Sequence, residues 1–219
     1  MRFEAILFDC DGILVDSEPI RLKILHHMLL ELGWHLSEEE CKKLFIGQST
    51  KADIALIEKK VGKKLDQDWI QAFQLRRNQA QRLQVVAVPG VYSCLKAVRK
   101  VWPSHLACVS AAEKSKILPQ LDRLGLSDFF NGQIFSGVDT THNKPYPDPY
   151  LAAAAALGVN ASNCAVIEDS VIGVTAGVAA GATVFAYCTE SDYAARLLQA
   201  GAHCTFQDMQ QLPQLLINE

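Results

Sequence analysis

The sequence predicts an α/β domain built on a parallel sheet, which an all-helical insert interrupts after the first strand. Five short segments are almost continuously apolar, and the stretches between the later ones have the periodicity of helices. Strands buried on both faces of a parallel sheet have this composition. Residues 16–86, in contrast, form one helical pattern after another. Because one strand precedes this region and the others follow it, the helical region is an insert in the α/β domain.

The expected strands organise the rest of the chain. They are residues 3–8, 105–110, 133–137, 164–169 and 182–187. Right-handed crossovers between parallel strands place the carboxyl ends of the strands on one edge of the sheet. Ligand sites of open α/β sheets lie at this edge. Polar residues at the ends of these strands are therefore the first candidates for a functional site.

The insert is expected to contain four helices. A capping box, Ser37 to Glu40, opens the second, and glycines at positions 33 and 62 end the first and third. The helices are expected over residues 17–32, from 37 onward, 50–60 and 66–83. Pro89-Gly90 marks the return to the α/β domain. The expected domains are a discontinuous core of residues 1–15 and 87–219, and a helical domain of residues 16–86.

Composition excludes several classes of protein. The chain has 219 residues, 49% of them hydrophobic, and its 21 Lys and Arg against 24 Asp and Glu give a net charge of −3. A mild negative charge without a basic run argues against nucleic acid, and no apolar run approaches the ~18 residues that span a bilayer. Seven scattered cysteines without a C-x-x-C pair indicate reduced thiols. We therefore expect a soluble cytoplasmic protein, a monomer or weak homodimer, that binds neither nucleic acid nor membranes.

The first candidate motif is Asp9-Cys10-Asp11-Gly12, which follows the first strand. In extended backbone, residues i and i+2 point the same way, so Asp9 and Asp11 are expected to face one site. Repulsion between two carboxylates favours a bound cation or a raised pKa in one of them. The alternative interpretation is a solvated acidic turn.

Two further motifs supply an anion site and a fixed cation. Ser110 ends a strand just before a helix expected from Lys114, where free backbone N–H groups and a hydroxyl favour an anion. Lys144 precedes Pro145 in a proline-rich segment that restricts its backbone. An ordinary helix cap and a surface lysine are the alternatives for these two residues.

The last motif is Glu168-Asp169-Ser170, in which two acids close an apolar strand. Adjacent carboxylates at a strand end suit Mg²⁺, a hard cation that prefers oxygen ligands. An acid pair, a hydroxyl, a lysine and a second acid pair together describe phosphoryl transfer. The sequence contains neither G-x-x-x-x-G-K nor G-x-G-x-x-G, which argues against nucleotide triphosphate and dinucleotide chemistry.

These motifs resemble the haloacid dehalogenase (HAD) superfamily, and within it the phosphatases similar to β-phosphoglucomutase. The pattern D-x-D-G-x-L-x-D-S runs from Asp9 to Ser17, and Ser110, Lys144-Pro145 and Glu168-Asp169-Ser170 follow in the family's order. The resemblance covers nearly the whole chain. It implies a Rossmann-like, three-layer core with a helical cap inserted after the first strand.

The resemblance also implies a role for each motif. Asp9 is implied to be the nucleophile that forms an aspartyl-phosphate, and Asp11 the acid and base. Ser110 and Lys144 are implied to hold the phosphoryl oxygens. The implied ligands of Mg²⁺ are Asp9, Asp11 through its backbone carbonyl, Glu168 and Asp169.

Two departures from the family pattern bear on the activity. Ser110 is followed by Ala111 and Ala112, where relatives often have Asn or Ser and then Gly, so a side-chain contact to phosphate is lost. Phosphosugar mutases of the family have His where this chain has Arg21, and Arg where it has Thr50. The loss of both groups favours simple hydrolysis over a mutase reaction.

The resemblance assigns substrate selection to the helical cap. The expected substrate-binding residues are Gly47, Gln48, Ser49, Thr50, Arg21 and Arg77, with Arg76 as a further basic candidate. Solvated helix faces are the alternative for the basic residues. If two of them face the pocket, the substrate carries a second negative group, which favours a sugar-acid phosphate such as 6-phosphogluconate. The alternatives are a neutral sugar phosphate, phosphoglycolate phosphatase, a β-phosphoglucomutase-type mutase or, in another class, a receiver-like signalling module.

Overall fold

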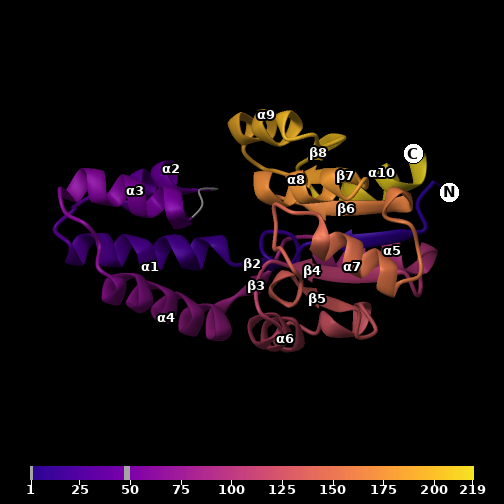
Figure 1. Cartoon of the computed structure of the whole chain (residues 1–219), viewed down its shortest axis with the longest axis horizontal. Helices are drawn as coiled ribbons and strands as arrows, with labels where there is room; N and C mark the ends of the chain where they lie inside the picture. The colour runs from indigo at the N-terminus through magenta and orange to yellow at the C-terminus, as the bar shows by residue number, and fades with distance from the viewer. Residues whose placement is uncertain (1, 47–49) are drawn as a thin grey trace. The chain divides into compact units, whose positions relative to one another are not determined.

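A computed structural model describes residues 2–46 and 50–219, and its centre is a six-stranded parallel sheet (Figure 1). The strand order is β5-β4-β1-β6-β7-β8. The strands are β1 (Ala5–Phe8), β4 (Leu106–Ser110), β5 (Ile134–Ser136), β6 (Cys164–Glu168), β7 (Thr183–Tyr187) and β8 (Cys204–Phe206). Since β4 and β6 both pair with β1, the ends of these three strands lie next to one another. This is the Rossmann-like α/β fold that the sequence predicts.

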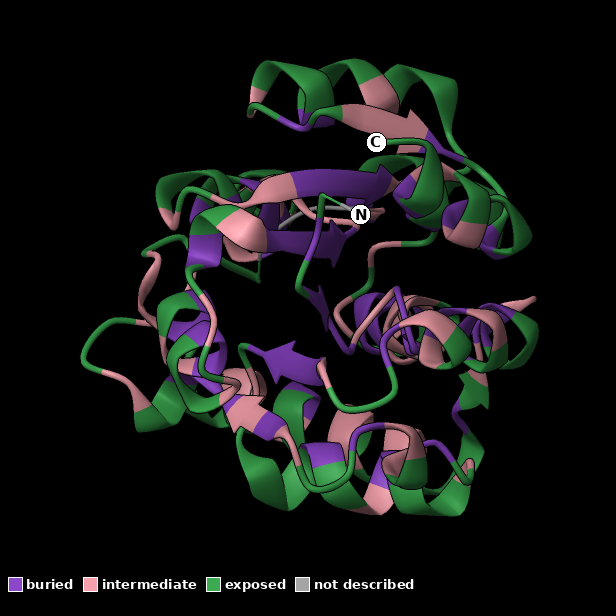
Figure 2. Ribbon diagram, turned by 90° about the vertical axis from the view of Figure 1, so that its right-hand side faces the viewer, coloured by how far each residue is buried: buried purple, intermediate pink, exposed green. Residues whose placement is uncertain are grey.

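Helices cover both faces of the sheet. They are α5 (Val91–Val101), α6 (Lys114–Arg123), α7 (Asp148–Ala156), α8 (Val171–Ala179), α9 (Ser191–Gln199) and α10 (Leu212–Asn218). Residues of α7, α8 and α9 share one core with Ala5 and Leu7 of β1. Ile6 and Phe8 point to the opposite face and are also fully buried. Figure 2 shows the same distribution, with buried residues along the strands and exposed residues on the outer helices.

Small residues bring α8 close to the sheet. A Cβ at Gly177 would lie 2.8 Å from Cγ2 of Val184, so any larger residue would push the helix away. Gly181, with φ of 84°, ends the helix in the left-handed conformation. The glycines after Glu168-Asp169 therefore determine how closely α8 packs against the sheet and where this helix ends.

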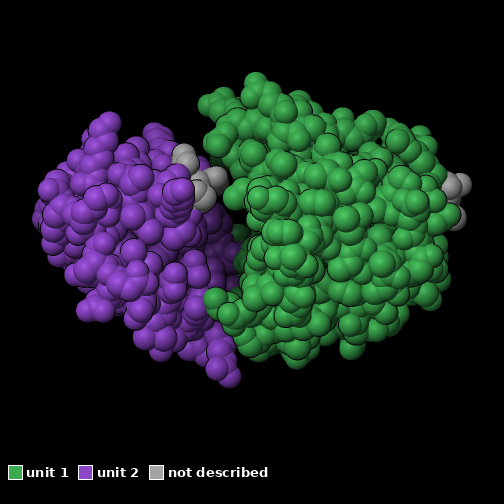
Figure 3. All heavy atoms as spheres, in the orientation of Figure 1, with its two compact units in different colours: residues 1–16, 86–219 green, residues 17–85 purple. Residues whose placement is uncertain are grey.

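A second compact unit, residues 17–85, has helices and no strand among its described residues, while residues 1–16 and 86–219 form the first unit (Figure 3). The helices of this helical unit are α1 (Glu18–Glu31), α2 (Glu38–Phe45), α3 (Thr50–Val61) and α4 (Gln67–Gln84). It has its own apolar core, to which Leu25, Phe45 and Phe73 contribute. The capping box at Ser37 and Glu40 is formed at the start of α2.

Three strands were not apparent in the sequence. β2 (Val15–Asp16) pairs antiparallel with β3 (Val86–Ala87), just before and just after the helical unit. Both strands have two residues, too few for a periodic pattern, and β8 is a three-residue edge strand. Short 3-10 helices complete the fold: η1 (Ser127–Phe129), η2 (Gly137–Asp139), η3 (Ala161–Asn163) and η4 (Met209–Gln211).

Two further observations concern the chain as a whole. Within residues 2–46 and 50–219, no helix has the length and apolarity that crossing a bilayer requires. The seven cysteines are free thiols, and six of them are buried. The structure thus contains no disulfide to stabilise it, and its stability comes from the apolar residues buried on both faces of the sheet and inside the helical unit.

Candidate functional site

The candidate site lies at the carboxyl edge of the parallel sheet, where three neighbouring strands end. Asp9 directly follows β1, Ser110 is the last residue of β4, and Glu168 is the last residue of β6. These side chains come from positions far apart in the sequence and meet because β1 lies between β4 and β6. Lys144 reaches the same place from the segment that precedes α7.

Lys144 is the centre of the site. Its ammonium Nζ donates to Asp9 Oδ1 at 2.6 Å, to Glu168 Oε1 at 2.7 Å and to the backbone carbonyl of Val109 at 2.9 Å. The Lys144 side chain is only 3% exposed. All three of its N–H donors are therefore used, and the cation is fixed between two buried carboxylates.

Glu168 is held by an unusually complete set of donors. Its Oε1 accepts from the hydroxyl of Tyr150, 2.7 Å away, as well as from Lys144. Its Oε2 accepts from the backbone N–H groups of Asp169 and Ser170 and from the Ser170 hydroxyl. A carboxylate offers about four lone-pair positions, so these five donors occupy Glu168 fully.

Burial and neighbouring charges shift the pKa values of the site. Burial raises the pKa of Asp9 to about 7, with Glu168 and Asp11 adding to the rise and Lys144 opposing it. Burial also acts to raise the pKa of Glu168, but Lys144, Tyr150 and Ser170 outweigh it and hold this pKa below its usual value. Burial opposes the charge on Lys144 as well, yet Asp9 and Glu168 raise its pKa well above the ordinary value. The site thus contains an ionised lysine and an ionised Glu168 beside a carboxyl group that titrates near neutrality.

The acidic turn after β1 lies against a further carboxylate of the site, that of Asp169. Gly12 has φ of 82°, and its N–H donates to the carbonyl of Val15, which closes a tight turn around the half-buried Asp11. A Cβ at residue 12 would lie 2.5 Å from Cγ of Asp169. Only glycine therefore allows the Asp169 carboxylate to lie against this turn. Oxygens of Asp9, Glu168 and Asp169 then lie within 4.8 Å of one another.

This arrangement fits a divalent cation. Three carboxylates at this spacing form the hard oxygen environment that Mg²⁺ prefers. The bare backbone at Gly12 lets the Asp169 carboxylate approach the acidic turn, where a side chain would displace it. Asp9 and Asp169 are the direct ligands that this geometry favours, because the oxygens of Glu168 already accept five hydrogen bonds.

Ser110 is buried beside the turn that connects β4 to α6. Its Oγ accepts from the backbone N–H of Ala112 at 3.1 Å, which leaves the hydroxyl hydrogen available as a donor. Asn143 ties this turn to Lys144, since its amide donates to the Ala111 carbonyl and its Oδ1 accepts from the Lys144 N–H. The Ser136 hydroxyl donates to the Ala112 carbonyl at 2.8 Å.

Sequence reasoning missed three residues that support the site. Tyr150, Asn143 and Ser136 touch Glu168, Lys144 and the turn after Ser110, respectively. Asn143 directly precedes Lys144, so its position next to a motif was a usable signal. Tyr150 lies in a helix and Ser136 ends a strand, where nothing in a single sequence distinguishes them from residues of the core.

The residues expected to bind the substrate belong to the helical unit. Gly47, Gln48 and Ser49 lie outside the described residues, and Thr50 is the exposed first residue of α3. Arg21 is not a free cation: it forms ion pairs at 2.7 Å with both Glu18 and Asp53.

The two other basic candidates lie on α4. The guanidinium of Arg77 lies over the Phe73 ring and donates to Asn78. Arg76 forms an exposed ion pair with Glu31. Both arginines thus have partners inside the helical unit.

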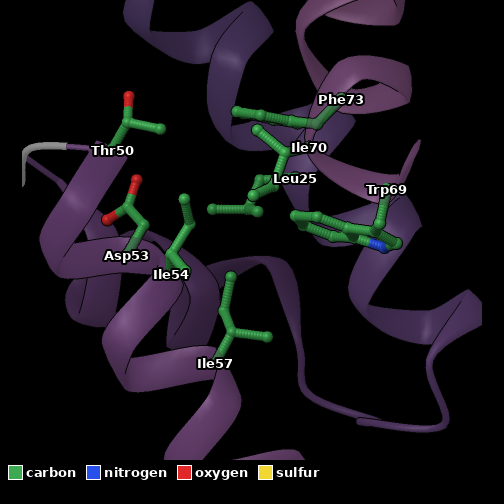
Figure 4. Close-up of a pocket in the computed structure, with 8 residues that line it drawn as sticks. All are labelled: Leu25, Thr50, Asp53, Ile54, Ile57, Trp69, Ile70 and Phe73. Carbon is green, nitrogen blue, oxygen red and sulfur yellow. The ribbon is translucent and has the colours of Figure 1, made fainter. Parts of the chain in front are cut away.

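A small hollow inside the helical unit is not a binding pocket. Asp53, Thr50 and six apolar or aromatic residues surround it (Figure 4). Its volume of about 10 Å³ is at the lower limit of what can hold one water molecule. It therefore belongs to the packing of α1, α3 and α4.

Comparison with known proteins identifies relatives over nearly the whole length of the chain. The family described as haloacid dehalogenase-like hydrolase matches residues 6–187. The 6-phosphogluconate phosphatase of Escherichia coli (strain K12) is 32% identical over 217 residues, which cover 98% of this chain and 95% of the relative. The fructose-1-phosphate phosphatase of the same organism is 27% identical over 82% of this chain and 94% of the relative.

A solved structure is similar in fold and in sequence. It is a HAD family hydrolase from Deinococcus radiodurans R1 with bound phosphate and sodium. The TM-score is 0.84 at 32% identity, and the match covers 99% of this chain and 96% of the other.

Proposed function

This chain belongs to the haloacid dehalogenase-like hydrolase family and is a phosphatase of that family, and we propose that it hydrolyses small phosphorylated sugars or sugar acids with Mg²⁺, through a phosphoryl group carried on Asp9. One observation carries the proposal: the Lys144 ammonium lies 2.6 Å from Asp9 beside two further carboxylates. This pairs a carboxylate that can attack phosphorus with a cation that can balance the charge of the phosphate.

The metal ion belongs at Asp9 and Asp169, with the backbone carbonyl of Asp11. Mg²⁺ bound there supplies positive charge that makes the approach of a phosphate to these acids favourable. Glu168 contributes negative charge to the site and fixes Lys144. The fit rests on the spacing of the carboxylates and on the close approach of Asp169 to the turn at Gly12.

In the first half of the proposed reaction, a carboxylate oxygen of Asp9 attacks phosphorus and the bond to the leaving alcohol oxygen breaks. Asp11 donates a proton to that oxygen. In the second half, Asp11 takes a proton from water, the water oxygen attacks phosphorus, and the bond to Asp9 breaks. Asp9 is regenerated and inorganic phosphate leaves.

Lys144 and Ser110 hold the transferred group in this scheme. Two donors of Lys144 are bound to Glu168 and to the Val109 carbonyl, and the third, on Asp9, can transfer to a phosphoryl oxygen. The Ser110 hydroxyl keeps one hydrogen to donate, because it accepts from Ala112. These donors stabilise the negative charge that develops on the equatorial oxygens of the phosphoryl group.

Phosphorylated sugars are proposed as the substrates because the relatives named above act on 6-phosphogluconate and fructose 1-phosphate. The charge of Arg21 does not support a second anion site, since Glu18 and Asp53 balance it. The substrate panel must therefore include sugar-acid phosphates and neutral sugar phosphates alike.

The proposal is tested by measuring phosphate release from such a panel in Mg²⁺ and in EDTA. We expect hydrolysis of at least one sugar phosphate or sugar-acid phosphate in Mg²⁺ and none in EDTA. Asp9→Asn is expected to be inactive, while Asp192→Asn, at an exposed site on α9, is the matched control. Absence of phosphate release from every ester in Mg²⁺ would refute the proposal.

We further propose that the protein acts in the cytoplasm as a monomer or weak homodimer. Its seven free thiols support a reducing compartment. Light scattering of the protein as it elutes from a size-exclusion column tests the oligomeric state, and a stable tetramer or larger assembly would contradict this proposal.

A further inference from the structure

Asn143 joins the segment that carries Lys144 to the turn after β4. Its Oδ1 accepts from the backbone N–H of Lys144 at 2.8 Å, and its Nδ2 donates to the backbone carbonyl of Ala111 at 2.8 Å. A backbone N–H can only donate and a carbonyl can only accept, so these two partners fix the orientation of the amide. Gly137 makes the arrangement possible, because a Cβ there would lie 2.7 Å from Cγ of Asn143.

The peptide group that Asn143 holds also contacts Ser110. This group lies between Ala111 and Ala112; its carbonyl accepts from Asn143, and its N–H donates to Ser110 Oγ at 3.1 Å. A chain of hydrogen bonds thus leads from the Lys144 N–H through Asn143 to Ser110, and each bond runs from donor to acceptor in the same direction. Hydrogen bonds aligned in this way strengthen one another. The chain ends at the buried Ser110 hydroxyl, whose hydrogen is left to donate.

Lys144 contacts the end of β4 on both sides of Ser110. Its ammonium Nζ donates to the Val109 carbonyl at 2.9 Å, one residue before Ser110. Its backbone N–H reaches the residue after Ser110 through Asn143. The two side chains that hold the phosphoryl group in the proposed reaction are therefore connected twice, once directly and once through Asn143.

We propose that Asn143 is a positioning residue for phosphate binding: it fixes the peptide group between Ala111 and Ala112, and this group aims the Ser110 hydroxyl at the phosphoryl oxygens beside Lys144. The inference rests on the function proposed above. Neither alanine has a side chain that can contact a phosphate, so the direction of the Ser110 hydroxyl matters all the more. Without Asn143, this peptide group is free to rotate, and the hydroxyl loses the partner that orients it.

The test is a double-mutant cycle between Asn143 and Ser110. Asn143→Leu keeps the branched shape of the side chain and removes both hydrogen bonds, and Asn143→Ala is the second variant. Each substitution is made in the wild type and in Ser110→Ala. The matched control is Asn160→Ala, because Asn160 also holds a loop through its side chain, which accepts from the Ser162 N–H at 3.0 Å just before β6.

Four quantities are measured for each protein. They are the inhibition constant of inorganic phosphate in Mg²⁺, kcat/KM for an ester that the wild type hydrolyses, the Mg²⁺ affinity of the metal-free protein by calorimetry, and the midpoint of thermal unfolding. We expect every variant to fold, because the Ser136 hydroxyl holds the Ala112 carbonyl at 2.8 Å and does not depend on Asn143.

In the wild type, both Asn143 substitutions should weaken inhibition by inorganic phosphate about 10-fold, because a hydrogen bond to a charged group is lost or misdirected. They should lower kcat/KM on the order of 10- to 100-fold. In Ser110→Ala, the same substitutions should change either quantity by less than about twofold, because the hydroxyl that Asn143 positions is gone. Mg²⁺ affinity should be unchanged, and Asn160→Ala should match the wild type throughout.

Three results would overturn the inference alone while the wild type is active. The first is an equal loss in the wild type and in Ser110→Ala, which indicates that Asn143 does not act through Ser110. The second is unchanged phosphate inhibition and turnover in both Asn143 variants. The third is a parallel loss of Mg²⁺ affinity, which indicates general damage to the site. A wild type that releases phosphate from no ester would instead refute the proposed function, and the inference with it.

Discussion

Gly12→Ala tests whether the acidic turn and Asp169 form one metal site. A Cβ at residue 12 would lie 2.5 Å from Cγ of Asp169, whereas ordinary contacts begin at 3.4 Å. Oδ2 of Asp169 lies nearer still to this Cβ, so the carboxylate must move by more than about 1 Å or the turn must open. Displacement of a metal ligand or of its support typically costs 10- to 100-fold in metal affinity or activity, and we expect a loss of this size.

Part of the effect of Gly12→Ala is backbone strain, which a matched variant measures separately. Gly12 has φ of 82° and Gly181 has φ of 84°, so alanine is strained at both, by about 1–2 kcal/mol. At Gly181 no atom lies within 4 Å of the added Cβ. Gly181→Ala should therefore lose similar stability and keep its metal affinity.

The assays are thermal unfolding and titration of the metal-free protein with Mg²⁺ by calorimetry, followed by Mg²⁺-dependent phosphate release. Gly12→Ala should show weaker Mg²⁺ binding and lower activity than Gly181→Ala at comparable stability. Equal Mg²⁺ affinity in Gly12→Ala and the wild type would refute the assignment of Asp169 to the metal site.

Three further predictions concern buried polar contacts. Lys144→Met should lower activity on the order of 10²- to 10³-fold, which steady-state kinetics measures. It should also raise the pKa of Asp9 above 7, because the positive charge that lowers this pKa is lost, and an infrared titration of the carboxyl groups checks this. Tyr150→Phe removes one donor from Glu168 and should destabilise the fold by about 1–3 kcal/mol, and a stability equal to the wild type in denaturant unfolding would contradict the buried contact. Burial raises the pKa of Asp53 from 3.8 to about 6, so its contribution to stability is present below about pH 4 and is lost as the pH rises through 6. The unfolding free energy of the wild type minus that of Asp53→Asn should thus fall by roughly 2 kcal/mol from pH 4 to pH 6, and a flat difference would count against the raised pKa.

Much of the fold could be predicted because burial leaves a clear trace in the sequence. The five predicted strands are mostly buried, so their segments are largely apolar, and each was located to within two residues of its observed ends. The edge strand β8 has a single buried residue, and β2 and β3 have two residues each, so none of the three leaves an apolar run in the sequence.

The candidate site was predictable where position alone determines proximity. Asp9, Ser110 and Glu168 end neighbouring parallel strands, so strand order places them together. The contacts of Lys144 depend on the path of the segment before α7, which no periodicity describes. Arg21 shows the limit of reasoning from charge: its ion pair with Asp53, 32 residues away, is set by the packing of α1 against α3.

The central claim is that Asp9 carries the phosphoryl group during turnover. Asp11→Asn removes the proposed base and should slow release of the phosphoryl group from Asp9. This variant is mixed with Mg²⁺ and an ester that the wild type hydrolyses, quenched in acid and digested for mass spectrometry. The account predicts one phosphoryl group on the peptide that contains Asp9, and none when Asp9→Asn is added to the same chain. A phosphoryl group on a different residue, or turnover by the Asp9→Asn variant near the wild-type rate, would contradict it.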